Sequence, residues 1–214
     1  MKPINQPAAL LLTSTHCPHC HVMQGLLEQH YQHSTPGLLQ VINIDDSPDV
    51  ARSHQVRSVP WLLLGPFEFD GVMTPAELNH WIGLTSQADA STDYLEYLLT
   101  NGKLSKAIAW IEKNNESLGS LLLLMVKDDV KMNARIGIGA IMEHFENTSE
   151  LENIIPLLTS QASHPSATVR ADVCHFLMLT HSERVIPVIQ TMLNDEDEQV
   201  REIARESLEE LSIS

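Results

Sequence analysis

Short apolar runs and helically spaced apolar positions alternate along the first 86 residues. The short runs predict β-strands, which are 8–13, 39–44 and 61–64. Helical spacing predicts helices at 18–31 and 50–54, and a Thr-Pro-Ala-Glu capping box predicts that a further helix begins after Thr74. The predicted order is β-α-β-α-β-(β)-α, which indicates an α/β fold.

The rest of the chain shows helical spacing almost throughout, and one helical pattern occurs three times. Val200-Arg201, Val169-Arg170 and Ala134-Arg135 each lead an amphipathic helix, at intervals of 31 and 35 residues. Shorter apolar helices are predicted between them at 151–158 and 184–193. Helix pairs that bury their apolar faces only against neighbouring pairs are typical of solenoids. The unit resembles HEAT-like helical repeats, which predicts an all-α second domain.

The two halves also differ in charge. Residues 1–86 hold 3 basic and 7 acidic side chains, whereas residues 87–214 hold 10 basic and 21 acidic ones. A polar stretch at 85–92 predicts the boundary between domain 1–86 and domain 87–214. The net charge of −15 repels phosphate backbones. We therefore expect no nucleic-acid partner, and we expect a protein partner of the second half to present a basic surface.

No segment of the sequence is apolar over the ~20 residues needed to cross a bilayer. The longest apolar runs are 61–64 and 121–126. The region before the first cysteine lacks the small-residue cleavage site of a secretory leader. We therefore expect no membrane partner and a cytoplasmic location, where disulfides are mostly transient and catalytic.

Two cysteines lie three residues apart in Cys17-Pro18-His19-Cys20, where a predicted strand is followed by a helix. Free N–H groups and the dipole at the helix start stabilise a thiolate, and a protonated His19 adds to this effect. The pKa of Cys17 is expected to fall from ~8.5 toward the ~3.5 to 7.5 range of reactive thiols. These four residues are the candidate catalytic residues, with Cys17 attacking and Cys20 resolving. Cys174 lies within a predicted helix and is expected to belong to the core.

Residues 1–86 resemble the thioredoxin superfamily. The resemblance rests on a strand, a C-x-x-C at the head of a helix, and Val59-Pro60 before a further strand, with Pro60 43 residues after Cys17. It implies that Pro60 is cis and packs against the disulfide, and that the main chain of Val59 pairs with the bound substrate. Trp61 stands where the family has threonine and is assigned to the same substrate-binding site.

Several positions depart from the thioredoxin pattern. Pro18-His19 resembles the dipeptide of periplasmic disulfide oxidases, in which stabilisation of the reduced thiolate makes the protein oxidising. Leu11 and Val41 occupy the positions of the family's buried carboxylate and a nearby lysine, and His16 replaces the tryptophan before the first cysteine. The direction of electron flow therefore stays open at this stage.

These features predict a thiol–disulfide oxidoreductase that acts on a protein disulfide or dithiol, with the Cys17-Cys20 pair as the redox centre and no metal or other cofactor. The helical repeats are expected to bind a protein partner. A second hypothesis is a non-catalytic adaptor in which both domains only dock partners. The cysteine pair is also compatible with a zinc site completed by His16 or His21, with a c-type haem site that has His21 as axial ligand, and with the relic of an active ancestor.

Overall fold

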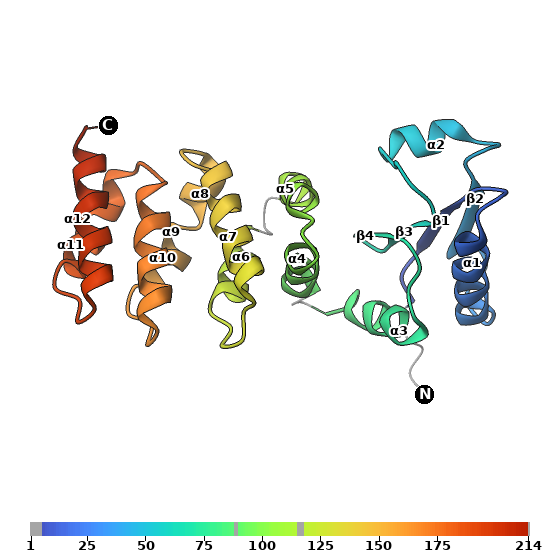
Figure 1. Cartoon of the computed structure of the whole chain (residues 1–214), viewed down its shortest axis with the longest axis horizontal. Helices are drawn as coiled ribbons and strands as arrows, with labels where there is room; N and C mark the ends of the chain where they lie inside the picture. Colours follow the sequence, from blue (N-terminus) through green and yellow to red (C-terminus); the bar gives the residue numbers. More distant parts are fainter. Residues whose placement is uncertain (1–5, 88–89, 115–117, 214) are drawn as a thin grey trace. The chain divides into compact units, whose positions relative to one another are not determined.

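The computed structural model describes residues 6–87, 90–114 and 118–213 (Figure 1). The chain divides into two compact units, Met1–Ala90 and Ser91–Ser214. Within the predicted boundary stretch 85–92, residues 88 and 89 lie outside the described residues. None of the helices described is both long enough and apolar enough to span a membrane.

The described strands of the first unit form one sheet in the order β2-β1-β3-β4. They are β1 (Ala9–Thr13), β2 (Leu39–Asn43), β3 (Trp61–Leu64) and β4 (Phe67–Asp70). β1 and β2 run parallel because helix α1 (Pro18–Tyr31) carries the chain back between them, whereas β3 runs antiparallel to both β1 and β4. Helices α2 (Pro48–Ser53) and α3 (Pro75–Leu84) complete the unit. The predicted α/β fold is therefore confirmed (Figure 1).

The core of the first unit forms around β1, which lies in the middle of the sheet. Leu11 and Leu12 point to opposite faces of the sheet and are both fully buried, so both faces are covered. Helix α1 packs against β1 and buries Met23. Trp81 of α3 packs its ring on Phe69 of β4, with the ring centroids 4.9 Å apart.

Helix α3 begins at the capping box that the sequence predicts. The Thr74 hydroxyl accepts the N–H of Glu77 at 3.2 Å, and the Glu77 carboxylate accepts the N–H of Thr74 at 2.7 Å. The hydrogen bonds from Thr74 hold the pKa of Glu77 below its usual value. The start of this helix is thus fixed by local sequence alone.

The second unit consists of helices joined by loops. In chain order they are α4 (Ala90–Thr100), α5 (Leu104–Lys113), α6 (Leu118–Met125), α7 (Met132–His144), α8 (Ser149–Asn153), α9 (Ile155–Ser160), α10 (Ala167–Met178), α11 (Ile186–Met192) and α12 (Glu198–Ile213). α7, α10 and α12 carry the three repeated motifs near their starts and lie in a row, with α10 packed against both others (Figure 1). The shorter helices α6, α9 and α11 pack against the long helix that follows each of them. The predicted stack of helix pairs is therefore confirmed.

Two helices that the sequence predicts as continuous are interrupted. The predicted helix 151–158 is broken between α8 and α9, and the predicted helix 184–193 opens with a 3-10 turn, Glu183–Val185, before α11. Pro156 and Pro187 lie in the first turns of α9 and α11. Proline lacks an N–H and its ring obstructs the preceding turn, so the prediction of one unbroken helix is wrong at both places.

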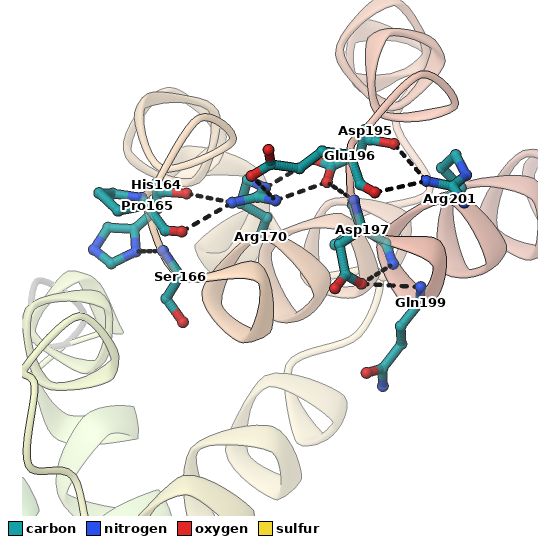
Figure 2. A network of polar contacts seen from close by, with 10 residues as sticks. His164, Pro165, Ser166, Arg170, Asp195, Glu196, Asp197, Gln199 and Arg201 are labelled. Carbon is teal, nitrogen blue, oxygen red and sulfur yellow. Dashed lines mark hydrogen bonds and ion pairs between the residues drawn. The ribbon is translucent and has the colours of Figure 1, made fainter.

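Arginines of the repeated motifs donate to the turn that precedes their own helix, as Figure 2 shows for Arg170 and Arg201. Arg170 and Arg201 each donate to the carbonyl oxygens six and five residues before them, at 2.7 to 3.1 Å. Arg170 also forms a bidentate ion pair with Asp195, and both bonds are 2.7 Å long. The side chains of Arg170 and Asp195 are only 7% and 10% exposed. Arg135 pairs in the same direction along the stack, with Asp172 of α10.

Histidine–glutamate contacts extend the repeat pattern toward the start of the second unit. Glu112 of α5 lies 3.1 Å from the ring of His144 in α7, and Glu143 of α7 lies 3.9 Å from the ring of His175 in α10. The second pair follows the first by 31 residues in both partners. Helix α5 therefore stacks on α7 as α7 stacks on α10, so the row of helices begins before the first of the three repeated motifs.

Candidate redox site

The two cysteines predicted to be reactive lie at the N-terminus of α1, where they form a disulfide. Cys17 is the N-cap residue, and its Sγ accepts the N–H of Cys20 at 3.1 Å. The Cα atoms of the two residues are 5.2 Å apart. Cys17 is partly exposed, whereas Cys20 is only 1% exposed. The first cysteine is therefore partly open to solvent, and the second is covered.

The start of α1 favours a negative charge on the first sulfur. The amide groups of a helix's first turn have no partner within the helix and point outward, as the positive end of the helix dipole. Pro18 occupies the first position of α1, where a missing N–H costs nothing, and the first turn contains no acidic residue. Nothing in that turn offsets the stabilisation of a thiolate at Cys17.

The segment before β3 lies beside Cys17. The Val59–Pro60 peptide bond is cis, as the resemblance implies. The Sγ of Cys17 lies 3.8 Å from the carbonyl oxygen of Val59, and the carbonyl oxygen of Pro60 accepts the N–H of Gly71 at 2.9 Å. Pro60 is buried and Val59 is half-buried. The main chain before the proline is therefore adjacent to the first sulfur.

The remaining predicted site residues differ in their exposure. Pro18 and His19 are exposed on the first turn of α1, and His16 and His21 are exposed on either side of the cysteine pair. Trp61 is only 2% exposed, and its ring packs on His54 with the centroids 5.1 Å apart. The structure therefore places Trp61 beneath the surface of the first unit.

Sequence reasoning missed a polar cluster beside the cysteine turn, formed by Ser14, Thr15, Asn43 and Asp45. Its side chains are joined by hydrogen bonds across the ends of β1 and β2. Polar residues follow both predicted strands, 8–13 and 39–44, but nothing in the local sequence indicates that these two strands pair with each other. The ends of parallel neighbouring strands meet at one edge of a sheet, and Thr13 pairs in register with Asn43.

Metal binding is a competing hypothesis for the cysteine pair. Among the residues described, no three or more histidine, cysteine, aspartate or glutamate side chains come together in a group that could hold a metal ion. His16 and His21, the ligands considered for a zinc site, are both exposed.

Cys174 has a different environment from the cysteine pair. It is fully buried in α10, and its Sγ lies 3.9 Å from the hydroxyl oxygen of Ser207 in α12. Loss of solvation through burial raises the pKa of its thiol to about 11. The expectation that Cys174 is a core residue is confirmed.

We expect Cys174 to stay unmodified when the native, reduced protein is treated with iodoacetamide at pH 8, because ~0.1% of a thiol with such a pKa is ionised there. Cys17 should be alkylated first, and Cys174 should react only after denaturation in urea. Peptide mass mapping of each cysteine over time measures this difference. Fast labelling of Cys174 in the native protein would mean that α10 and α12 separate readily.

Comparison with known families agrees with this geometry. Residues 9–83 match the sequence model of the thioredoxin domain, and residues 116–209 match that of HEAT repeats. A search of curated proteins found none that matches the chain. The first match covers the sheet and the cysteine pair, and the second covers α6 to α11 and α12 as far as Glu209. The chain therefore joins a thioredoxin-like domain with a C-P-H-C motif to a series of HEAT-like helical repeats.

Proposed function

We propose that the protein is a thiol–disulfide oxidoreductase that acts on protein substrates through Cys17 and Cys20. The carrying observation is the disulfide at the start of α1, with its first cysteine partly exposed and its second buried. The Val59 carbonyl beside the first sulfur offers a main-chain acceptor for an extended substrate segment. Such an arrangement suits attack by one thiol followed by resolution by the other.

In the proposed reductive direction, the thiolate of Cys17 attacks one sulfur of a substrate disulfide. The substrate's S–S bond breaks, its other sulfur leaves as a thiolate that takes up a proton, and a mixed disulfide with Cys17 forms. Cys20 then loses its proton and attacks the Sγ of Cys17, which releases the second substrate thiol and leaves the Cys17–Cys20 disulfide. Two electrons pass from the dithiol to the substrate, and the same steps in reverse oxidise a substrate dithiol.

The remaining predicted site residues support this chemistry in the proposal. His19, exposed in the first turn of α1, adds positive charge near the thiolate when it is protonated. Val59 pairs with the substrate main chain, Pro60 shapes the segment that presents it, and Trp61 supports that segment from within the unit. Pro18 fixes the first turn of the helix that begins at Cys17.

The direct test is turnover of a disulfide-containing protein such as insulin, with dithiothreitol as the electron donor and formation of free thiols as the readout. The wild-type chain should accelerate the reaction, and a Cys17→Ser, Cys20→Ser variant should return it to the uncatalysed rate. Cys174→Ala is the matched control, because it removes a cysteine that the mechanism does not use. Equal rates with wild-type and the double variant would contradict the proposal.

The helical repeats are proposed to bind a protein partner that presents a basic surface. Residues 87–214 carry 21 acidic and 10 basic side chains, and the outer helix α12 exposes several acids, which are Glu198, Glu202, Glu206, Glu209 and Glu210. A stack of helix pairs offers an extended surface for such a partner. This half of the proposal does not depend on the cysteine pair.

For a partner of this kind, we expect affinity to fall by about tenfold between ~50 and ~300 mM salt, because salt screens exposed charges. Calorimetric titration of the full chain with such a partner protein, at both salt concentrations, measures the change in affinity. The Cys17→Ser, Cys20→Ser variant should bind equally well, which separates docking from redox chemistry. An affinity that does not respond to salt would exclude a basic partner surface.

A cytoplasmic location is also part of the proposal. A reactive cysteine pair suits a compartment where most disulfides are transient. Fractionation of cells that express the full-length protein tests this directly. Recovery in a membrane or secreted fraction would contradict the proposed location without affecting the proposed chemistry.

A further inference from the structure

A set of hydrogen bonds ties the chain before Cys17 to the end of β2. One carboxylate oxygen of Asp45 accepts the N–H of Thr15 at 2.8 Å and the hydroxyl of Ser14 at 2.9 Å. The side-chain amide of Asn43 donates to the hydroxyl oxygen of Thr15 at 2.9 Å. The Oδ1 of Asn43 also accepts the N–H of Asp45 at 2.9 Å, so the two β2-end residues orient each other. Ser14 is therefore held through its hydroxyl, and Thr15 is held through both its N–H and its hydroxyl.

This polar cluster is joined directly to the first cysteine. The carbonyl oxygen of Ser14 accepts the N–H of Cys17 at 3.3 Å, which closes a turn over residues 14–17. Cys17 is in turn the N-cap of α1, and its carbonyl oxygen accepts the N–H of Cys20 at 3.0 Å. The attacking sulfur at the helix start is therefore joined, through the turn over residues 14–17, to Asp45 in the turn that follows β2.

We propose that Asp45 is a positioning residue for the thiol–disulfide reaction, which holds the turn over residues 14–17 so that Cys17 caps α1. The inference rests on the proposed redox function and adds a residue that acts on the sulfur only through Ser14 and Thr15. Hydrogen bonds to an ionised acceptor are stronger than those to a neutral one. The bonds from Thr15 and Ser14 hold the pKa of Asp45 below its usual range, so the acceptor is a carboxylate at neutral pH.

The adjacent residue Asp46 provides a matched comparison. Asp46 is also exposed and follows directly in the chain, and its N–H donates to the carbonyl oxygen of Asn43. Within the part of the chain that the structure describes, no hydrogen bond joins its side chain to the turn over residues 14–17. Substituting either aspartate by asparagine removes one negative charge from the same edge of the sheet. Only the change at Asp45 replaces the ionised acceptor of these two hydrogen bonds by a neutral amide oxygen, which is a weaker acceptor.

The experiment compares Asp45→Asn with Asp46→Asn in the full-length chain, with thermal unfolding as a check of folding. The first readout is the pH profile of Cys17 alkylation in the reduced protein, and the second is the kcat and KM of protein-disulfide reduction. We expect the alkylation midpoint of Asp45→Asn to lie at least about half a pH unit above that of Asp46→Asn. We also expect its kcat/KM to be about tenfold lower, mainly through kcat.

The two readouts distinguish failure of this inference from failure of the proposed function. If the two variants have the same alkylation profile and the same kcat/KM, Asp45 is not a positioning residue. If the wild type reduces no protein disulfide, the proposed function falls, but the alkylation profiles still decide whether Asp45 controls Cys17. Should Asp45→Asn unfold, Ser14→Ala provides the second variant, because it removes the hydroxyl that donates to the Asp45 carboxylate. A normal alkylation profile in a folded Ser14→Ala protein would then overturn the proposed role of Asp45.

Discussion

A Cys20→Ala variant is expected to accumulate covalent complexes with substrate proteins through Cys17. In the wild type, the buried thiol of Cys20 lies within bonding distance of the first sulfur and resolves the mixed disulfide. Without it, the intermediate persists until an external thiol attacks. Non-reducing electrophoresis of the variant after incubation with a disulfide-containing protein should show bands that reducing agent removes. We expect their yield to exceed that of the wild type by at least about tenfold.

The matched variants make this result specific. A Cys17→Ser, Cys20→Ala protein lacks the attacking thiol and should give no such bands. Cys174 remains in every variant, and its burial in α10 keeps it from forming complexes of its own. Mass spectrometry of the trapped complex should place the bond at Cys17. Bands of equal strength with and without Cys17 would show that the complexes do not arise from the proposed site.

Replacement of Arg170 by methionine should produce the largest loss of stability in the helical repeats. Arg170 makes two bonds of 2.7 Å to Asp195 and further bonds to two main-chain carbonyl oxygens. Removing the guanidinium leaves the largely buried carboxylate of Asp195 without its cation. We expect the free energy of unfolding to fall by about 2–4 kcal/mol, as measured by urea unfolding.

Arg184→Met is the control, because it removes an exposed pair. Arg184 lies 3.5 Å from Glu152, and the two side chains are 67% and 48% exposed, so its loss should cost at most ~0.5 kcal/mol. A cost of Arg170→Met as small as that of Arg184→Met would mean that the Arg170 network does not hold the repeats together.

The ion pair between Arg170 and Asp195 also predicts how the stability of the repeats depends on pH. The hydrogen bonds from Arg170 lower the pKa of Asp195 in the folded state. A carboxyl group with a lowered folded pKa stabilises the protein above its unfolded pKa of ~3.9, and that contribution is lost as the pH falls through the folded value. The difference in stability between wild type and Arg170→Met should therefore be largest near neutrality and shrink below a pH of about 4. A difference that grows on acidification would contradict this assignment.

Local sequence signals account for most of the fold. The predicted helix 18–31 and the capping box at Thr74 agree with α1 and α3, because each depends on side chains close in the chain. The breaks just before α9 and α11 were not predicted, although the sequence has Pro156 and Pro187 at these places. Apolar spacing continues across each proline, so the period alone does not reveal the break.

Part of the candidate site could also be predicted from local sequence, and part of it depends on how the strands pair. The C-x-x-C spacing and Val59-Pro60 could be found by motif, and the structure brings them together. The role of Asp45 could not be found, because it depends on the register between β1 and β2, which pairs Thr13 with Asn43. The burial of Trp61, in contrast, agrees with the continuous apolar run 61–64, because such a run is typical of a strand that is covered on both faces.

The most direct test of the redox function is an equilibrium titration of the Cys17–Cys20 couple in glutathione or dithiothreitol buffers, with alkylation and intact mass as the readout. The protein should first be shown to contain neither metal nor haem. We predict a reversible two-electron transition with a midpoint between about −270 and −120 mV, and the value will show whether the protein is better suited to reduction or to oxidation. Failure to form an intramolecular disulfide under any buffer, or thiols blocked by a bound metal, would contradict the proposed function.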